Sequence, residues 1–461
     1  MLSRKTMENL IDSALYSGCN YIELFMENSK KVSKDISNGI LTRIDTNNSC
    51  GVGIRAFSKL GFSYISTNDF SEKNLFSIIK EISNPVYTND FSKKHYCLPA
   101  LKRCNIQDHI KLGNQETETE TEEMLMGITK KIKSSFPLVI DAVGTDYREN
   151  QNVLIANSNG LFVEDNRTRI RLTFDVFASN RTEQHNLSFS CGEAMSEKTF
   201  ANIDFESECF DVAETTIKFL NATYAPAGLM PVVIDNGFGA IIFHEACGHS
   251  LEATSVANNT SVFFDKLNTQ ISNDMLTMVD DGTLKNAWGT SAVDDEGNPT
   301  KEHILIKNGV LKSFLLDDIT SKKLGMKNNN SCRRESYKYP PSPRMSNTYI
   351  KNGVISRDDI IASVDYGILI KGIGGGAANP SNGDFEFTSN EGYLIEKGKV
   401  TKPLRTITLI GNGCEILNKI ELIGNNLKIS EGYCGSISGN IPITVGQPTI
   451  KINELNIGGV V

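Results

Sequence analysis

The chain has 461 residues, of which 39% are hydrophobic and 22% charged, and its net charge is −8 with a pI near 5.5. This composition is typical of a globular protein, and the length predicts two or three domains. The acidic balance argues against a nucleic-acid binder. No stretch approaches the ~20 apolar residues that span a bilayer, and the N-terminus lacks the apolar run of a signal peptide. The ten cysteines are scattered, so we expect reduced thiols, a cytoplasmic protein and no membrane partner.

Residues 1–84 are predicted to form an N-terminal α/β unit. A helical pattern over residues 5–17 comes first, and short alternating runs between residues 21 and 66 predict strands. Asn38-Gly39 separates two of these runs and is typical of a tight hairpin turn. A second helical pattern over residues 72–82 closes the unit.

Residues 85–225 are predicted to be a middle α+β region, whose first part, 85–115, resembles a linker. The acidic run 116–123 is interpreted as the solvated start of a helix, where acids suit the helix dipole. Alternating patterns return between residues 137 and 192, with a turn at Asn159-Gly160, and a helix is expected near 207–220. The order of strands and turns in this region is weakly similar to that in the first unit.

Residues 226–461 are predicted to form a C-terminal, mainly antiparallel β domain. Three Asn-Gly pairs, at 308–309, 352–353 and 382–383, lie between alternating runs and favour hairpins, which are too short for parallel crossovers. The fold class is therefore α+β: a β-rich N-terminal region with flanking helices, followed by this domain, which carries the helix with His244 near its start.

His244, Glu245 and His249 lie within six residues, in a chain with only six histidines. The zinc-protease signature His-Glu-x-x-His has one residue fewer between its histidines. On a regular α-helix, residues five apart point about 140° away from each other. A π-type turn brings them back to one face, and such turns are enriched at functional sites. We therefore predict a non-α turn over residues 246–248.

Two histidines leave a zinc site one ligand short, and spacing alone does not identify the third. Glu245 takes the position of an acid that polarises water beside the metal. Glu252, one helical turn after His249, suits either a ligand or a group that orients the histidine. The candidates for the third ligand are Glu252, Cys247, His303, Cys332, Cys414 and Cys434.

His244-Glu-Ala-Cys-Gly-His-Ser-Leu-Glu252 resembles the His-Glu-Ala-x-Gly-His-x-x-Glu signature of the metalloproteases in the TldD/PmbA family. Further matching segments follow in the expected order along nearly the whole chain. They are residues 51–57, 279–283, 293–297, 333–337, 343–349, 372–376 and 445–448.

The resemblance implies a zinc metallopeptidase that hydrolyses unfolded or modified peptides, with one zinc ion per chain. It implies that His244, His249 and Cys434 bind the zinc and that Glu245 is the general base. It also implies a dimer, with a metal-free TldE/PmbA-type paralogue or with a second copy. Ala253-Thr254 and the stretch 434–439 depart from the family pattern beside the site, which bears on substrate preference.

Substrate binding is predicted for Gly374, Gly375 and Arg344. The glycine run 372–376 suits close approach of a peptide backbone, or else a tight turn with positive φ. Arg344 suits a peptide carboxylate, or else a nearby acid of the protein itself. The run lacks the setting of a dinucleotide site. The alternative function is a non-catalytic subunit or peptide-binding scaffold of a TldD/TldE-type complex.

Overall fold

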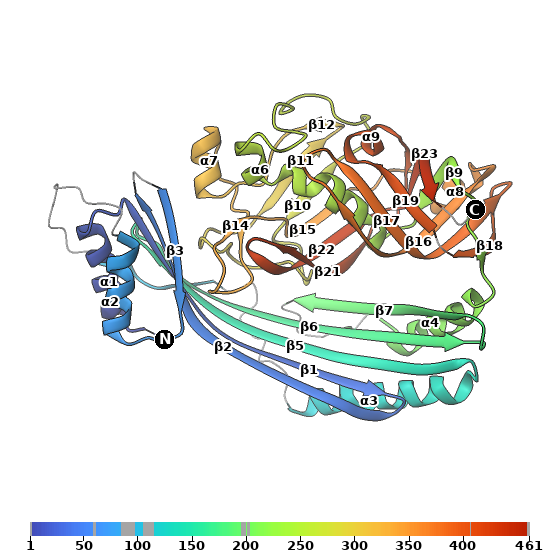
Figure 1. Cartoon of the computed structure of the whole chain (residues 1–461), viewed down its shortest axis with the longest axis horizontal. Helices are drawn as coiled ribbons and strands as arrows, with labels where there is room; N and C mark the ends of the chain where they lie inside the picture. The colour runs from blue at the N-terminus through green and yellow to red at the C-terminus, as the bar shows by residue number, and fades with distance from the viewer. Residues whose placement is uncertain are drawn as a thin grey trace.

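The computed structural model describes residues 2–58, 61–83, 97–104, 115–194, 200, 203–405 and 407–458. A long, curved sheet from the N-terminal half sweeps beneath a β-rich C-terminal body (Figure 1). The mixture of mostly antiparallel sheets with flanking helices confirms the α+β class. Among the described residues, no helix has both the length and the apolar character that a bilayer crossing requires.

The N-terminal sheet has seven strands in the order β3-β2-β1-β5-β6-β4, and β7 also pairs with β6. The strands are β1 (Tyr21–Ser37), β2 (Ile40–Ser58), β3 (Gly61–Thr67), β4 (Lys102–Cys104), β5 (Val139–Asn157), β6 (Phe162–Ser179) and β7 (Gln184–Ala194). Asn38 and Gly39 have φ angles of 50° and 88°, which confirms the predicted turn between β1 and β2. Because β1 pairs with β5, residues on both sides of position 84 share one sheet, and a domain boundary there stays a prediction.

Four helices cover the two ends of this sheet. They are α1 (Arg4–Tyr16), α2 (Glu72–Ser83), α3 (Gln115–Ser135) and α4 (Phe205–Phe219). One core lies under α1 and α2, and a second lies under α3 and α4 at the other end (Figure 1). The acidic run 116–123 lies in the first turns of α3, so the predicted helix is confirmed. The predicted linker is described only at 97–104; the rest of it lies outside the described residues.

The C-terminal body contains two large sheets and one short pair. The eight-stranded sheet contains β8 (Thr223–Tyr224), β9 (Gly228–Ile234), β16 (Tyr366–Ala378), β17 (Asp384–Glu396), β18 (Lys399–Arg405), β19 (Ile407–Asn412), β20 (Ile420–Ile423) and β23 (Ile450–Gly458). The six-stranded sheet contains β10 (Met278–Asp281), β11 (Glu302–Lys307), β12 (Val310–Leu311), β15 (Asn347–Ile350), β21 (Lys428–Ser436) and β22 (Gly439–Gln447). The pair is β13 (Cys332–Arg333) with β14 (Ser342–Pro343).

Short helices connect these strands, and two of the three expected Asn-Gly hairpins are present. The helices are α5 (Ile241–Phe243), α6 (Ala253–Ala257), α7 (Asp318–Leu324), α8 (Arg357–Ala362) and α9 (Gly413–Asn418). The pairs at 308–309 and 382–383 join antiparallel strands. The hairpin expected at 352–353 is wrong, because that pair joins β15 to α8. Gly353 instead lies against the Ile423 backbone, where a Cβ would meet the carbonyl oxygen at 2.2 Å.

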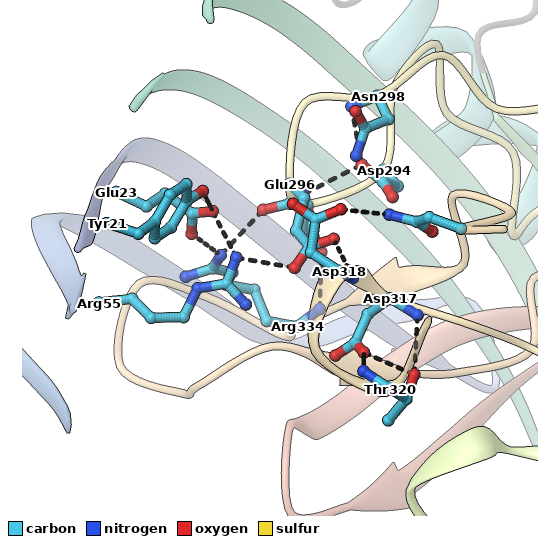
Figure 2. A network of polar contacts seen from close by, with 12 residues as sticks. Tyr21, Glu23, Arg55, Asp294, Glu296, Asn298, Asp317, Asp318, Thr320 and Arg334 are labelled. Atoms are coloured by element: carbon cyan, nitrogen blue, oxygen red, sulfur yellow. Dashed lines mark hydrogen bonds and ion pairs between the residues drawn. The ribbon is translucent and has the colours of Figure 1, made fainter. Parts of the chain in front are cut away.

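A buried ion-pair network joins the N-terminal sheet to the C-terminal body (Figure 2). Arg55 on β2 is fully buried, and its Nη2 donates to Glu23 on β1 at 2.5 Å and to Glu296 at 2.8 Å. Glu296 lies in the loop before β11, so this one guanidinium bridges both parts of the protein. Arg334 donates to the other oxygen of Glu23 at 2.7 Å. Charges buried this deeply must be paired, because water no longer solvates them.

Replacing Glu296 with glutamine is expected to flatten the pH dependence of stability between about pH 4.5 and 7. Burial raises the pKa of the Glu296 carboxyl to about 7; Arg55 opposes this rise, while Asp318 and Asp317 add to it. The folded protein therefore holds this proton more tightly than the unfolded chain, whose glutamates titrate near pH ~4.3. The resulting stability is present below that value and is lost as the pH rises through about 7.

Urea unfolding at several pH values measures this effect. Over this pH range, the free energy of unfolding should fall by up to about 3 kcal/mol more in the wild type than in Glu296→Gln. Glu302→Gln is the control, because Glu302 forms an exposed pair with Lys351, and it should keep the wild-type slope. Equal slopes for the wild type and Glu296→Gln would contradict the prediction.

Candidate metal centre

The His244 segment follows β9 directly and forms three short helical pieces in succession. A 3₁₀ turn (Phe238–Ala240) and α5 lead into a π-helical turn over His244–Gly248, and a 3₁₀ turn (His249–Leu251) follows. The His249 amide donates to the His244 carbonyl, five residues back, so the predicted non-α turn is confirmed. The φ of Gly248 is an ordinary −58°; a Cβ there would instead meet Met345 Sδ at 2.3 Å.

The π turn places the two histidine rings together. Their centroids are 5.1 Å apart and the ring planes lie at 85° to each other. Cys434 on β21 completes the cluster, with its Sγ 3.1 Å from His249 Nε2. Donor atoms of His244, Glu245, His249 and Cys434 all lie within 4.8 Å of one another.

His244 provides the clearest indication that this cluster holds a ligand. Its side chain is 1% exposed, and neither Nδ1 nor Nε2 has a hydrogen-bond partner among the residues that the structure describes. Buried polar groups in native proteins are almost always satisfied, so a ring with two orphaned nitrogens calls for an explanation. Burial, together with His249 and Arg344, lowers the pKa of His244 well below its ordinary value. The ring is therefore neutral, which is the form that binds metals.

Glu245 and His249 share one polar edge of the cluster. Burial raises the pKa of Glu245; His249 opposes this and Glu252 adds to it. The Glu245 side chain is 29% exposed, and its Oε2 lies 3.5 Å from His249 Nε2. Burial lowers the pKa of His249, but Glu252 and Cys434 outweigh it and hold that pKa well above its usual range. Glu245 is thus a solvent-accessible carboxyl placed to exchange protons at the cluster.

Glu252 lies behind His249 and not among the clustered donor atoms. Its Oε1 is 3.1 Å from His249 Nδ1, which leaves Nε2 facing Cys434 and Glu245. A carboxylate on the far nitrogen of a histidine fixes its tautomer and ring orientation in metal sites. Of the two readings that the sequence left open for Glu252, the structure shows the contacts of an orienting group.

The other candidate ligands are not part of the cluster. The Cys247 thiol is buried against the Gly413 carbonyl at 3.4 Å, and Cys414 lies on α9. His303 lies on β11. Cys332 belongs to a second donor group, with Glu296 and Asp317. In that group both carboxylates already accept protein hydrogen bonds, Glu296 from Arg55 and Asp318, and Asp317 from Thr320.

Arg344 is 1% exposed, and its guanidinium bonds to three groups next to the clustered donor atoms. It donates to Glu252 Oε1 at 3.2 Å, to the Cys434 carbonyl at 2.8 Å and to Ser438 Oγ at 3.1 Å. These bonds match the alternative interpretation, in which Arg344 pairs with an acidic side chain of the protein itself. Binding of a substrate carboxylate by Arg344 stays a prediction.

Gly374 and Gly375 are exposed on β16, and the alternative of a positive-φ turn is wrong there. β16 pairs with β9 only over Ile368–Ile370, so in the described part of the chain its edge is unpaired beyond Ile370. The sequence did not predict a second such edge, on β21, which among the described strands pairs only with β22. Alternation along residues 428–436 was the available signal, but an edge position is not encoded locally.

A cleft of about 770 Å³ opens between these two strand edges and β7. Lys371, Gly372, Ile373 and Gly374 of β16 line it, together with residues 428–431 of β21. The same strand β21 carries Cys434 three residues after Glu431, a distance of about 10 Å at ~3.3 Å per residue. None of His244, Glu245, His249 and Cys434 lines the cleft, because side chains three residues apart on a strand point to opposite faces and the Cys434 thiol faces away from Glu431.

Comparison with known proteins identifies the class. Three domains described as PmbA/TldA metallopeptidase match in order: domain 1 over residues 22–84, the central domain over 114–223 and the C-terminal domain over 227–459. A Haemophilus influenzae protein named metalloprotease TldD homolog is 32% identical, over 99% of this chain and 97% of its own. A Saccharolobus solfataricus protein named zinc metalloprotease TldD homolog is 31% identical over 57% of this chain and 59% of its own.

Solved structures share the fold at low sequence identity. TldE from Thermococcus kodakarensis superimposes with a TM-score of 0.75 at 20% identity, covering 98% of this chain and all of that one. A Thermotoga maritima protein described as a candidate modulator of a DNA gyrase gives 0.76 at 20% identity, covering 98% of this chain and 99% of its own. The domain matches and the full-length relative show that the chain belongs to the TldD/PmbA family of metallopeptidases.

Proposed function

We propose that the chain is a zinc-dependent peptidase in which His244, His249 and Cys434 hold one zinc ion and Glu245 is the general base. The observation that carries the proposal is the buried His244 ring, whose nitrogens have no hydrogen-bond partner within the described ranges, beside His249 and Cys434. A nitrogen, nitrogen and sulfur donor set suits zinc, and three protein ligands are typical of catalytic sites. The relative named as a zinc metalloprotease supports the same metal.

Bound zinc supplies Lewis-acid chemistry at this cluster, because it polarises a peptide carbonyl and makes water more acidic. Glu245 accepts the proton from the attacking water on its carboxylate and passes it to the leaving amine. Burial suits it to this task, since it raises the carboxyl pKa towards neutral pH. Glu252 holds the His249 ring through Nδ1, so that Nε2 stays directed at the cluster.

Unfolded peptides are the proposed substrates, and the two open strand edges support this class. An extended peptide gains main-chain hydrogen bonds when it adds to a sheet edge, and these bonds do not depend on its sequence. Gly374 and Gly375 on β16 present no side chain that would keep such a backbone away. Most backbone groups of a folded protein are already hydrogen-bonded, so unfolded peptides are the better source of a free extended segment. A TldE-like paralogue or a second copy of this chain is the proposed partner; the structural likeness to TldE supports the first.

Cys434→Ala and Cys414→Ala form a matched pair for testing the site. We expect the first to lose zinc and peptide hydrolysis together, by more than the roughly 10–100-fold that losing an orienting partner costs. The second removes a thiol from α9, outside the cluster, and should keep both. Elemental analysis of the purified protein and cleavage of an unstructured peptide measure the two properties.

A wild-type chain that binds no zinc would overturn the proposal and favour the non-catalytic scaffold. Equal zinc content in both cysteine variants would remove Cys434 from the ligand set. Cleavage of a folded protein as fast as the unstructured peptide would contradict the proposed substrate class.

A further inference from the structure

Arg344 occupies an unusual position, because it is buried between the two segments that supply the cluster's donor atoms. It follows β14, whereas the histidines follow β9 and Cys434 lies on β21. Each of its three guanidinium nitrogens has a partner: Nε donates to Glu252, Nη1 to Ser438 and Nη2 to the Cys434 carbonyl. With the side chain 1% exposed and a protein partner on every nitrogen, the Arg344 guanidinium faces the protein interior and not the solvent.

These bonds form a continuous path around the cluster. His249 Nδ1 contacts Glu252, Glu252 accepts from Arg344, and Arg344 donates to the backbone of Cys434. The bond to Ser438 secures the turn of the β21–β22 hairpin, which carries Cys434. The path therefore links two donor residues that are 185 positions apart in the chain.

The chemistry of the path requires arginine. The Glu252 carboxylate is largely buried, so hydrogen-bond donors of the protein must take the place of water around its oxygens. A planar guanidinium donates in several fixed directions at once, whereas a lysine ammonium is a single point charge on a flexible stem. Lysine at this position could reach Glu252 or the Cys434 carbonyl but could not hold both in one geometry.

We propose that Arg344 is a positioning residue that sets the placement of the Cys434 thiolate relative to His249 Nε2 and thereby the affinity for the metal. This inference rests on the proposed function, since it concerns the same ligands. It assigns Arg344 to the assembly of the metal centre and not to recognition of a peptide carboxylate.

Binding of Co²⁺ to the apoprotein tests the inference without any measurement of catalysis. Thiolate-to-cobalt charge-transfer absorbance reports the Cys434 bond, and competition with a chelator gives the affinity. Arg344→Lys should bind Co²⁺ about 10–100-fold more weakly, with a weaker charge-transfer band. Arg357→Lys is the matched control, because Arg357 makes three partly buried bonds to Asp235 and none to the cluster, and it should match the wild type.

Ser438→Ala provides a second variant if Arg344→Lys does not fold, because it removes an acceptor of Arg344 and leaves the Glu252–His249 contact in place. It weakens the same path at the hairpin turn and should shift the Co²⁺ affinity in the same direction. Wild-type affinity and an unchanged band in both variants would overturn the inference while leaving the proposed function intact. Unchanged Co²⁺ binding with a raised KM for peptides would also overturn it, in favour of substrate binding. A wild-type chain that does not bind Co²⁺ or Zn²⁺ would instead overturn the proposed function, and this inference with it.

Discussion

Replacing Arg55 with methionine is expected to lower the free energy of unfolding by about 3–5 kcal/mol. The substitution keeps much of the side-chain length but leaves Glu296 buried without its cation and Glu23 with one cation, Arg334, in place of two. Removing one partner of a buried pair is costly because the remaining charge has neither water nor a counter-ion. Urea unfolding, followed by the fluorescence of the single tryptophan, Trp288, measures the change.

A double variant and a surface control sharpen this result. Arg55→Met combined with Glu296→Gln should recover part of the loss, because the stranded charge is also removed. Arg103→Met removes a cation from an exposed pair with Glu164 and should cost no more than about 1 kcal/mol. Strictly additive effects at Arg55 and Glu296 would show that the two side chains do not stabilise each other.

Replacing Glu245 with glutamine is expected to reduce peptide hydrolysis by about 10²–10⁴-fold while zinc stays bound. Glutamine preserves the size of the side chain but cannot accept a proton from water at neutral pH. The proposed zinc ligands are untouched, so the loss should fall on kcat. Steady-state cleavage of an unstructured peptide, with elemental analysis of the same sample, measures both properties.

His249→Ala is the companion variant, because it removes a proposed ligand and should lose zinc and hydrolysis together. Comparing the two variants distinguishes the loss of the general base from the loss of the metal. Hydrolysis by Glu245→Gln at the wild-type rate would exclude Glu245 as the base. Loss of zinc from that variant would instead make Glu245 a ligand, which its place in the donor cluster allows.

Two buried arginines illustrate how long-range contacts organise this protein. Arg334 bonds to Glu23 in the N-terminal sheet, and the preceding Arg333 donates to the Pro442 carbonyl on β22. Pro442 lies opposite Tyr433, the residue before Cys434. The segment that joins the two parts of the protein therefore also supports the hairpin that carries the proposed thiolate ligand.

Local features of the chain were predictable because they depend on neighbouring residues. The five-residue spacing of His244 and His249 predicted a π turn, since helical geometry fixes the angle between side chains. Asn38-Gly39 predicted a hairpin because both residues adopt positive φ. The same reasoning was wrong at 352–353, where no hairpin forms. Gly353 instead allows a close approach to the backbone of Ile423 on β20.

Contacts between distant segments were decided only by the tertiary structure. Spacing left six candidates for the third ligand, and the family resemblance, not periodicity, pointed to Cys434. The fold brings that thiol to 3.1 Å from His249 through a hairpin 185 residues away. From the sequence, Arg344 suited either a substrate carboxylate or an acidic side chain of the protein. In the structure it is buried, and it bonds to Glu252, Ser438 and the Cys434 carbonyl. Local patterns specify turns and helices, but which strands meet, and which charges are buried together, depends on packing over the whole chain.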